Sequence, residues 1–180
     1  MNHKTYDLVY VSMFAILLAI CSWLSIPTMV PFTLQTFGIF FTLLMLGGKQ
    51  GTSVILLYLL LGSIGLPVFS NFGAGIGYLL GNTGGYTLGF LATGLMFWLF
   101  EIIFPRKALM QVIALLLGLI LCYLFGTFWI LNLSISSGNI LGFRAVFSMC
   151  VLPFIVPDLC KLWLAYLLSK RFRNLLHKTY

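Results

Sequence analysis

Residues 65–86 read Gly65-Leu-Pro-Val-Phe-Ser-Asn-Phe-Gly-Ala-Gly-Ile-Gly-Tyr-Leu-Leu-Gly-Asn-Thr-Gly-Gly-Tyr86 and form the longest break in an otherwise apolar sequence. Glycine lets the backbone approach a ligand or another backbone closely, and a long loop of this kind is usually either functional or disordered. The Phe, Tyr, Leu and Ile residues among the glycines argue against disorder. We predict a packed lid and wall over a pocket; the alternative is a plain connection between two membrane helices.

The composition around this segment is that of a membrane protein. Of the 180 residues, 61% are hydrophobic and 7% are charged, whereas soluble proteins carry about 25% charged residues. The apolar stretches are continuous rather than alternating, which favours helices over a barrel. The net charge of +7 comes from basic residues at the ends of these stretches. That placement is typical of membrane topology, so nucleic-acid binding is excluded as a function class.

The apolar stretches predict one all-α integral membrane domain over residues 1–180, with six transmembrane helices. The second and third stretches are short and need tilt or loop residues to cross. The expected helices cover approximately residues 8–26, 37–46, 52–65, 87–104, 108–131 and 147–169.

The basic residues predict the orientation of these helices. The side with the two termini and the short turns carries eight of them: Lys4, Lys49, Arg106, Lys107, Lys170, Arg171, Arg173 and Lys178. The other side carries only Arg144. The positive-inside rule therefore predicts cytoplasmic N- and C-termini. It also places the three long loops, where a binding site would be built, on the extracellular side.

Asp158 and Lys161 form the most unusual pattern in the apolar stretches. Ionisable side chains at membrane depth are costly and usually face a cavity or one another, and a spacing of three residues puts them on one helix face. Pro157 is expected to bend or locally open the helix. A structural ion pair and a proton relay are alternatives; we favour a pair that lines a binding pocket. Gln35, beside a membrane boundary, either contacts a ligand or caps the second helix.

Several site types have no support in the sequence. It contains no P-loop, no metalloprotease motif and no serine-hydrolase motif, so we expect neither catalytic residues nor ATP hydrolysis. The four cysteines form no C-x-x-C pair, which argues against a metal site or a disulfide framework. Ala15 and Ala19 lie four residues apart in the first helix. Such small-residue pairs allow close helix packing, and from the residues alone packing within the chain is favoured.

Four stretches taken together resemble the BioY family, the biotin-specific substrate-binding (S) components of energy-coupling factor (ECF) vitamin transporters. They are Val30-Pro-Phe-Thr-Leu-Gln-Thr-Phe-Gly38, Leu57-Tyr-Leu-Leu-Leu-Gly-Ser-Ile-Gly-Leu-Pro-Val-Phe69, Gly81-Asn-Thr-Gly-Gly-Tyr-Thr-Leu-Gly-Phe90 and Pro157-Asp-Leu-Cys-Lys161. Where the family commonly has proline before Thr83 and glycine before Asp158, this chain has Asn82 and Pro157.

The resemblance implies an S-component fold that captures biotin as a transported substrate, without a cofactor, in a prokaryotic cell membrane. The partners it implies are a transmembrane coupling subunit, which would dock on Ala15 and Ala19, and two ATPase subunits. The first and third outer loops would close the site. Together with the residue patterns, it indicates substrate contacts from Gln35, Asn82, Tyr86, Asp158 and Lys161.

Phe32, Phe69, Phe72 and Tyr78 are expected as apolar walls or lid residues. Three alternatives to a biotin S component remain open at this point. One is an S component for another vitamin, and the others are a stand-alone proton-coupled carrier and a small membrane enzyme.

Overall fold

The computed structural model describes residues 3–26, 30–105, 107–136 and 142–178, and these form an all-helical bundle with one short strand pair. The helices are α1 (His3–Trp23), α2 (Gln35–Leu46), α3 (Gly48–Ser63), η1 (Ser70–Phe72), α4 (Ile76–Leu79), α5 (Gly84–Ile103), α6 (Ala108–Ser136), α7 (Phe143–Cys150) and α8 (Leu152–Lys178). The strands β1 (Ser25–Ile26) and β2 (Phe32–Thr33) pair antiparallel, with Ser25 opposite Thr33.

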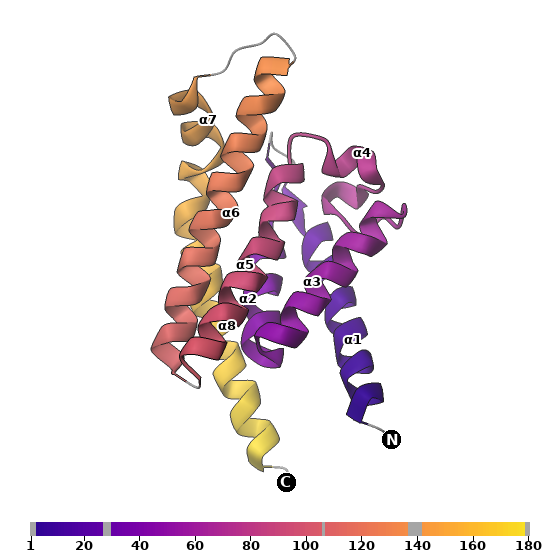
Figure 1. Cartoon of the computed structure of the whole chain (residues 1–180), viewed down its shortest axis with the longest axis vertical. Helices are drawn as coiled ribbons and strands as arrows, with labels where there is room; N and C mark the ends of the chain where they lie inside the picture. Colours follow the sequence, from indigo (N-terminus) through magenta and orange to yellow (C-terminus); the bar gives the residue numbers. More distant parts are fainter. Residues whose placement is uncertain (1–2, 27–29, 106, 137–141, 179–180) are drawn as a thin grey trace.

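The long helices run alternately between two ends of the bundle (Figure 1). The start of α1, the α2–α3 turn and the end of α8 lie at one end, which we call the terminal end. The strand pair and α4 lie toward the opposite end, which we call the loop end. Polar connections therefore collect at the loop end, as the sequence predicts.

Four helical segments are long and apolar enough to cross a membrane: Thr5–Trp23, Gly84–Ile103, Ala108–Ser136 and Phe143–Arg173. The helices α2 and α3, with 12 and 16 residues, are about 18 and 24 Å long at 1.5 Å per residue. A hydrocarbon core is about 30 Å thick. The short α2 therefore leaves space at the loop end, and a polar cavity occupies that space.

The helices α5 and α6 pack through small residues that the sequence analysis did not single out. Gly85, Gly89 and Thr93 of α5 follow one another at four-residue spacing and face α6. A Cβ added at Gly89 would lie 3.0 Å from the Cα of Cys122. The Thr93 hydroxyl also donates to the Gly118 carbonyl at 2.9 Å. Small residues let membrane helices approach closely and add backbone contacts.

The α2–α3 turn is shorter than the gap between the expected helices 37–46 and 52–65, because α3 already begins at Gly48. One residue, Gly47, reverses the chain with a φ of 81°. The Glu101 carboxylate of α5 accepts a hydrogen bond from the Gly48 N–H at 2.6 Å, and the Arg173 guanidinium of α8 donates to the Leu44 carbonyl. An acidic group at a helix start and a basic group near a helix end both stabilise the helix dipoles.

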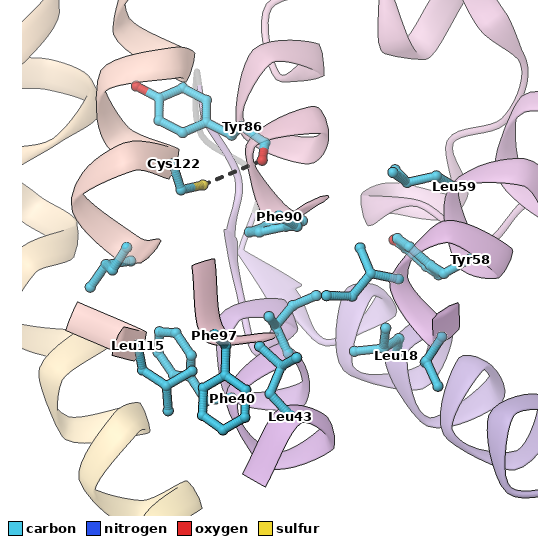
Figure 2. Close-up of a cluster of buried hydrophobic side chains, with 14 of the residues drawn as sticks. Leu18, Phe40, Leu43, Tyr58, Leu59, Tyr86, Phe90, Phe97, Leu115 and Cys122 are labelled. Carbon is cyan, nitrogen blue, oxygen red and sulfur yellow. Dashed lines mark hydrogen bonds between the residues drawn. The ribbon is translucent and has the colours of Figure 1, made fainter. Parts of the chain in front are cut away.

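The core is one cluster of buried side chains that extends across the bundle. Figure 2 shows Leu115 of α6, Phe97 of α5, Phe40 of α2 and Leu18 of α1 in this cluster. Such a core holds α2 and α8 in place as the walls of the cavity at the loop end.

Two local predictions need correction. The segment 66–83 is not a continuous loop, since it contains η1 and α4, and α5 starts at Gly84. The expected local opening at Pro157 is also absent, because α8 continues through this residue; the expected bend there stays a prediction. The helix is interrupted instead at Val151, with φ −124° and ψ −54°, one residue before α8 begins.

Candidate functional site

The polar cavity lies between α2, α5, α6 and α8 and is covered by the segment 66–80 and the strand pair. Its lining combines aromatic rings with a few polar groups, as expected of a site for a small organic molecule. The lining residues are Val30, Pro31, Thr33, Gln35, Thr36, Ser70, Tyr78, Thr83, Tyr86, Thr87, Phe90, Cys122, Tyr123, Cys150, Phe154, Asp158 and Lys161.

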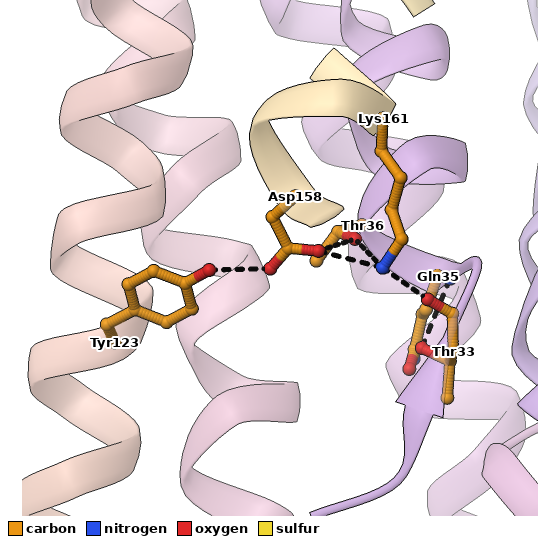
Figure 3. Close-up of polar contacts among 6 residues, drawn as sticks. All are labelled: Thr33, Gln35, Thr36, Tyr123, Asp158 and Lys161. Atoms are coloured by element: carbon orange, nitrogen blue, oxygen red, sulfur yellow. Dashed lines mark hydrogen bonds and ion pairs between the residues drawn. The ribbon is translucent and has the colours of Figure 1, made fainter. Parts of the chain in front are cut away.

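Asp158 and Lys161 are at the centre of a hydrogen-bonded network (Figure 3). They form a salt bridge of 2.8 Å and are 2% and 7% exposed. Thr36 donates to Asp158 Oδ1 at 2.8 Å and Tyr123 donates to Oδ2 at 2.7 Å. Lys161 Nζ also donates to the Thr33 carbonyl at 2.7 Å. The network joins α2, α6, α8 and β2, and its net charge is zero.

The network leaves little hydrogen-bonding capacity unused. The Lys161 ammonium has three protons, and three acceptors lie around it: Thr33 O, Asp158 Oδ1 and, at 3.2 Å, Thr36 Oγ1. Each carboxylate oxygen has about two acceptor sites. Oδ1 accepts from Thr36 and Lys161, and Oδ2 accepts from Tyr123. Among the described contacts, one acceptor site therefore remains on Asp158, at Oδ2.

Gln35 belongs to a second chain of hydrogen bonds. Its Nε2 donates to the Tyr58 hydroxyl at 2.7 Å, and that hydroxyl donates to the Val68 carbonyl at 3.1 Å. Tyr58 is fully buried, so this chain fixes the orientation of the Gln35 amide. The bond from Nε2 orients the whole amide group, so the amide oxygen of Gln35 also has a fixed direction. Such an arrangement is expected of a ligand-binding group.

The segment 66–80 is attached to the end of α1. The Trp23 indole donates to the Pro67 carbonyl at 2.8 Å and stacks on Phe72 at 5.3 Å between centroids. The Ser25 hydroxyl donates to Asn71 Oδ1 at 2.9 Å. Asn71 has a φ of 54°, in the left-handed region that side chains other than glycine rarely adopt. Contacts with Trp23 of α1 and Ser25 of β1 therefore hold this segment against the end of α1.

The four expected wall or lid residues have different positions. Tyr78 lines the cavity and stacks on the buried ring of Phe69 at 4.7 Å. The ring of Phe32 lies 4.4 Å from Lys161 Nζ and stacks on Phe154. Phe72 is 63% exposed and packs on Trp23 rather than lining the cavity.

Tyr86 and Asn82 also differ in position. Tyr86 lines the cavity, and its hydroxyl donates to the Cys150 carbonyl at 3.3 Å. A Cβ added at Gly126 would lie 2.3 Å from the Tyr86 ring, so the glycine makes room for the ring. Asn82 is exposed and is not among the described lining residues, whereas its neighbour Thr83 is. The structure therefore brings Gln35, Tyr86, Asp158 and Lys161 to one cavity and leaves Asn82 outside it.

Ala15 and Ala19 lie in the core, at 3% and 5% exposure, on the face of α1 that packs against α2 and α3. The opposite face of α1 exposes Met13, Ile16 and Ile20. A direct contact between the alanine pair and a partner would require α1 to separate from α2 and α3. The docking role of this pair stays a prediction.

Three polar groups of the site were not predicted from the sequence: Thr36, Tyr58 and Tyr123. All three carry hydroxyl groups: Tyr58 and Tyr123 lie inside the expected helices 52–65 and 108–131, and Thr36 directly precedes the expected helix 37–46. A hydroxyl in or beside a membrane helix is only weak evidence for a binding site, because it can also bond to the backbone of its own helix. Among the described residues, no group of three or more His, Cys, Asp or Glu side chains comes together to hold a metal ion.

Comparisons with known proteins agree on one family. A family model described as the BioY family matches residues 1–178. The probable biotin transporter BioY of Pyrococcus horikoshii is 33% identical over 95% of this chain and 98% of its own. The biotin transporter BioY of Thermotoga maritima is 36% identical over 94% and 96%. A crystal structure of the S-component for biotin from an ECF-type ABC transporter superposes with a TM-score of 0.81, at 29% identity, over 97% of this chain and 95% of that one.

Proposed function

This chain belongs to the BioY family, and from this premise we propose that it captures biotin as the substrate-binding component of an ECF vitamin transporter. The observation that carries the proposal is the cavity that Gln35, Tyr86, Asp158 and Lys161 line together. Biotin combines a ureido ring and a thioether ring with an aliphatic chain that ends in a carboxylate. A largely apolar cavity with a few fixed polar groups suits this molecule.

The unused acceptor site of Asp158 supports an assignment of one end of biotin. A ureido N–H can donate to Asp158 Oδ2, whereas the biotin carboxylate would be repelled by this group. Lys161 can contact a ligand only if one of its three present acceptors is displaced, and the Thr36 hydroxyl, at 3.2 Å, is the most distant of them. We therefore place the ureido ring beside Asp158. Asn82 lies outside the cavity lining, and its contact with biotin stays a prediction.

The protein is a multi-pass membrane protein, and we propose that it crosses the cell membrane six times with the terminal end in the cytoplasm. The charge distribution supports this orientation. The exposed Lys49 lies at the start of α3, Lys107 directly precedes α6, and Lys170 and Arg171 lie in the C-terminal part of α8. These segments lie toward the terminal end (Figure 1). The cavity then opens to the outside, under the segment 66–80. In the short helices α2 and α3, flanking residues complete the crossing.

We further propose that the chain is not an enzyme and needs no cofactor of its own. ATP hydrolysis would take place in two separate ATPase subunits, linked to this chain through a transmembrane coupling subunit. The relative with a solved structure is a component of an ECF-type ABC transporter, which supports this assembly. Co-purification of this chain with co-expressed coupling and ATPase subunits would test it.

The experiment that tests the substrate is calorimetric titration of the detergent-purified protein with biotin, with thiamine and riboflavin as controls. We expect saturable binding of biotin alone. Binding of another vitamin in place of biotin would keep the fold and the assembly but contradict the assignment of the pocket. No binding of any vitamin to folded protein would favour a stand-alone carrier or a membrane enzyme.

A further inference from the structure

A second hollow lies on the outside of the bundle and shares one residue, Tyr123, with the polar cavity. We call it the α6–α8 groove, and it lies between α6 and the α7–α8 pair. It holds about 320 Å³ of free space. Its lining is almost entirely apolar and consists of Leu116, Leu119, Ile120, Tyr123, Leu124, Thr127, Phe128, Phe143, Phe147, Val151, Ile155 and Leu159.

The break between α7 and α8 shapes this groove. Val151, at the break, is a lining residue, and the rings of Phe143 and Phe147 on α7 form its upper wall together with Phe128 of α6. Ile120, Phe128 and Phe143 are 52%, 60% and 53% exposed, so the groove opens outward. Both of its walls belong to segments apolar enough to cross a membrane, and its opening therefore faces lipid.

An apolar hollow of this size is filled in the membrane. Water is not stable in an apolar cavity without polar partners, and an empty hollow forfeits the dispersion contacts of its lining. From Leu116 to Phe128 the groove extends about 18 Å along α6, at 1.5 Å per residue. One leaflet of a bilayer has a hydrocarbon depth of about 15 Å, half of the whole core. The length of the groove thus matches one acyl chain.

A positive charge adjoins the groove. Arg144 directly follows the lining residue Phe143 and is exposed. On α7 it lies on the flank of the face that Phe143 and Phe147 present to the groove, since successive residues are turned by about 100°. A guanidinium forms paired hydrogen bonds with phosphate oxygens. The charge and the apolar hollow together match the two parts of a phospholipid.

We propose that the α6–α8 groove binds one acyl chain of a membrane phospholipid whose phosphate contacts Arg144. Tyr123 lines both the groove and the polar cavity. The bound chain therefore packs against the back of the ring whose hydroxyl donates to Asp158. The proposal rests on the membrane location argued above and does not depend on the identity of the substrate.

Native mass spectrometry of the purified protein, titrated with dioleoylphosphatidylglycerol in mild detergent, tests this site. We expect one tightly retained phospholipid on the unmodified chain and about a tenfold loss of affinity in Arg144→Gln, with Arg144→Lys intermediate. Ile120→Trp places a large ring in the groove and should abolish retention. Its matched control is Ile102→Trp, on an exposed position of α5 outside the groove, which should retain the lipid.

Two outcomes would overturn the proposal. Equal retention by the unmodified chain, Arg144→Gln and Ile120→Trp would show that no defined site exists. Loss in Arg144→Gln with full retention in Ile120→Trp would leave a headgroup contact without an occupied groove. Thermal unfolding verifies that each variant is folded, and Ile120→Phe replaces the tryptophan variant if that one unfolds. Biotin titration of the same samples reports separately on the substrate site.

Discussion

Asp158 and Lys161 form a buried neutral pair in which nearly every donor and acceptor is used. Desolvation of two charges in an apolar bundle is costly, and the hydrogen bonds from Thr36 and Tyr123 offset part of this cost. The pair is therefore a structural element of the cavity wall, and in the proposed function it also presents fixed polar groups to the ligand. Variants of the pair are therefore expected to change both the stability of the protein and its biotin binding, and the two effects can be measured separately.

Removal of one charge should destabilise the protein, and removal of both should restore it. Lys161→Met leaves the Asp158 carboxylate buried without its counter-charge, which costs about 3–5 kcal/mol. In the double variant Asp158→Asn, Lys161→Met the site is neutral again, so thermal stability should return close to that of the unmodified protein. Both variants should lose biotin binding in calorimetric titration. A single variant as stable as the unmodified chain would contradict the buried ion pair.

Tyr123→Phe tests the hydrogen bond to Asp158 while the ring stays in place. Hydrogen bonds to charged groups contribute about 1.5–3 kcal/mol, and we expect a fall in biotin affinity of about tenfold, which corresponds to about 1.4 kcal/mol. Tyr10→Phe is the control, since Tyr10 is 49% exposed on α1. Unchanged affinity in Tyr123→Phe would mean that the phenol does not orient Asp158 for the ligand.

Among the elements, α5 and α6 pack closely, because glycines line their contact on both helices. The same pair positions two site residues, Tyr86 on α5 and Tyr123 on α6. The Tyr86 ring packs against Gly126 of α6. One turn earlier in α6, the Cys122 thiol donates to the Tyr86 carbonyl at 3.4 Å (Figure 2). Close packing of these helices is thus part of the construction of the site.

A matched pair of glycine substitutions tests this packing. Gly126→Ala puts a Cβ 2.3 Å from the Tyr86 ring, and overpacking of this kind costs about 1–3 kcal/mol. We expect a lower unfolding temperature and weaker biotin binding, because the displaced ring lines the cavity. Gly77→Ala meets no atom within 4 Å and should behave like the unmodified protein. Equal behaviour of the two variants would argue against a steric role of Gly126.

For the molecule as a whole, the polar cavity is near one end, and the exposed Lys49, Lys107, Lys170 and Arg171 are near the other. The Glu101 and Arg173 contacts to the α2–α3 turn tie α5 and α8 to this basic end. The helices α2 and α8 extend from that end to the site, where Thr36 and Asp158 meet at 2.8 Å. The two ends of the molecule are thus joined by the packed helix pair α2 and α8.

Cysteine labelling of intact cells tests the orientation. In a Cys160→Ser background the remaining native cysteines are buried. Asn82→Cys, exposed at the loop end, should react with a membrane-impermeant maleimide in intact cells. Lys49→Cys, exposed at the terminal end, should react only after the membrane is disrupted. The opposite pattern would reverse the proposed orientation and place the cavity opening in the cytoplasm.

The sequence by itself determined the all-helical membrane class and the family. A long apolar stretch in a bilayer forms a helix, because the helix satisfies every backbone polar group within the segment itself. It also singled out Asp158 and Lys161, since charges at membrane depth are rare enough to stand out. These inferences depend on local composition and on quoted motifs, which are readable without knowledge of any contact.

Only the tertiary structure decided which residues share the cavity and what each one contacts. The hydroxyls of Tyr123 and Thr36 reach Asp158 from other helices, 35 and 122 positions away in the chain, and no local pattern encodes such distances. Burial of Ala15 and Ala19 likewise depends on which face of α1 meets α2 and α3. The α7–α8 break lies at Val151, and Pro157 stays inside α8, although proline is the residue that locally disfavours a helix interior.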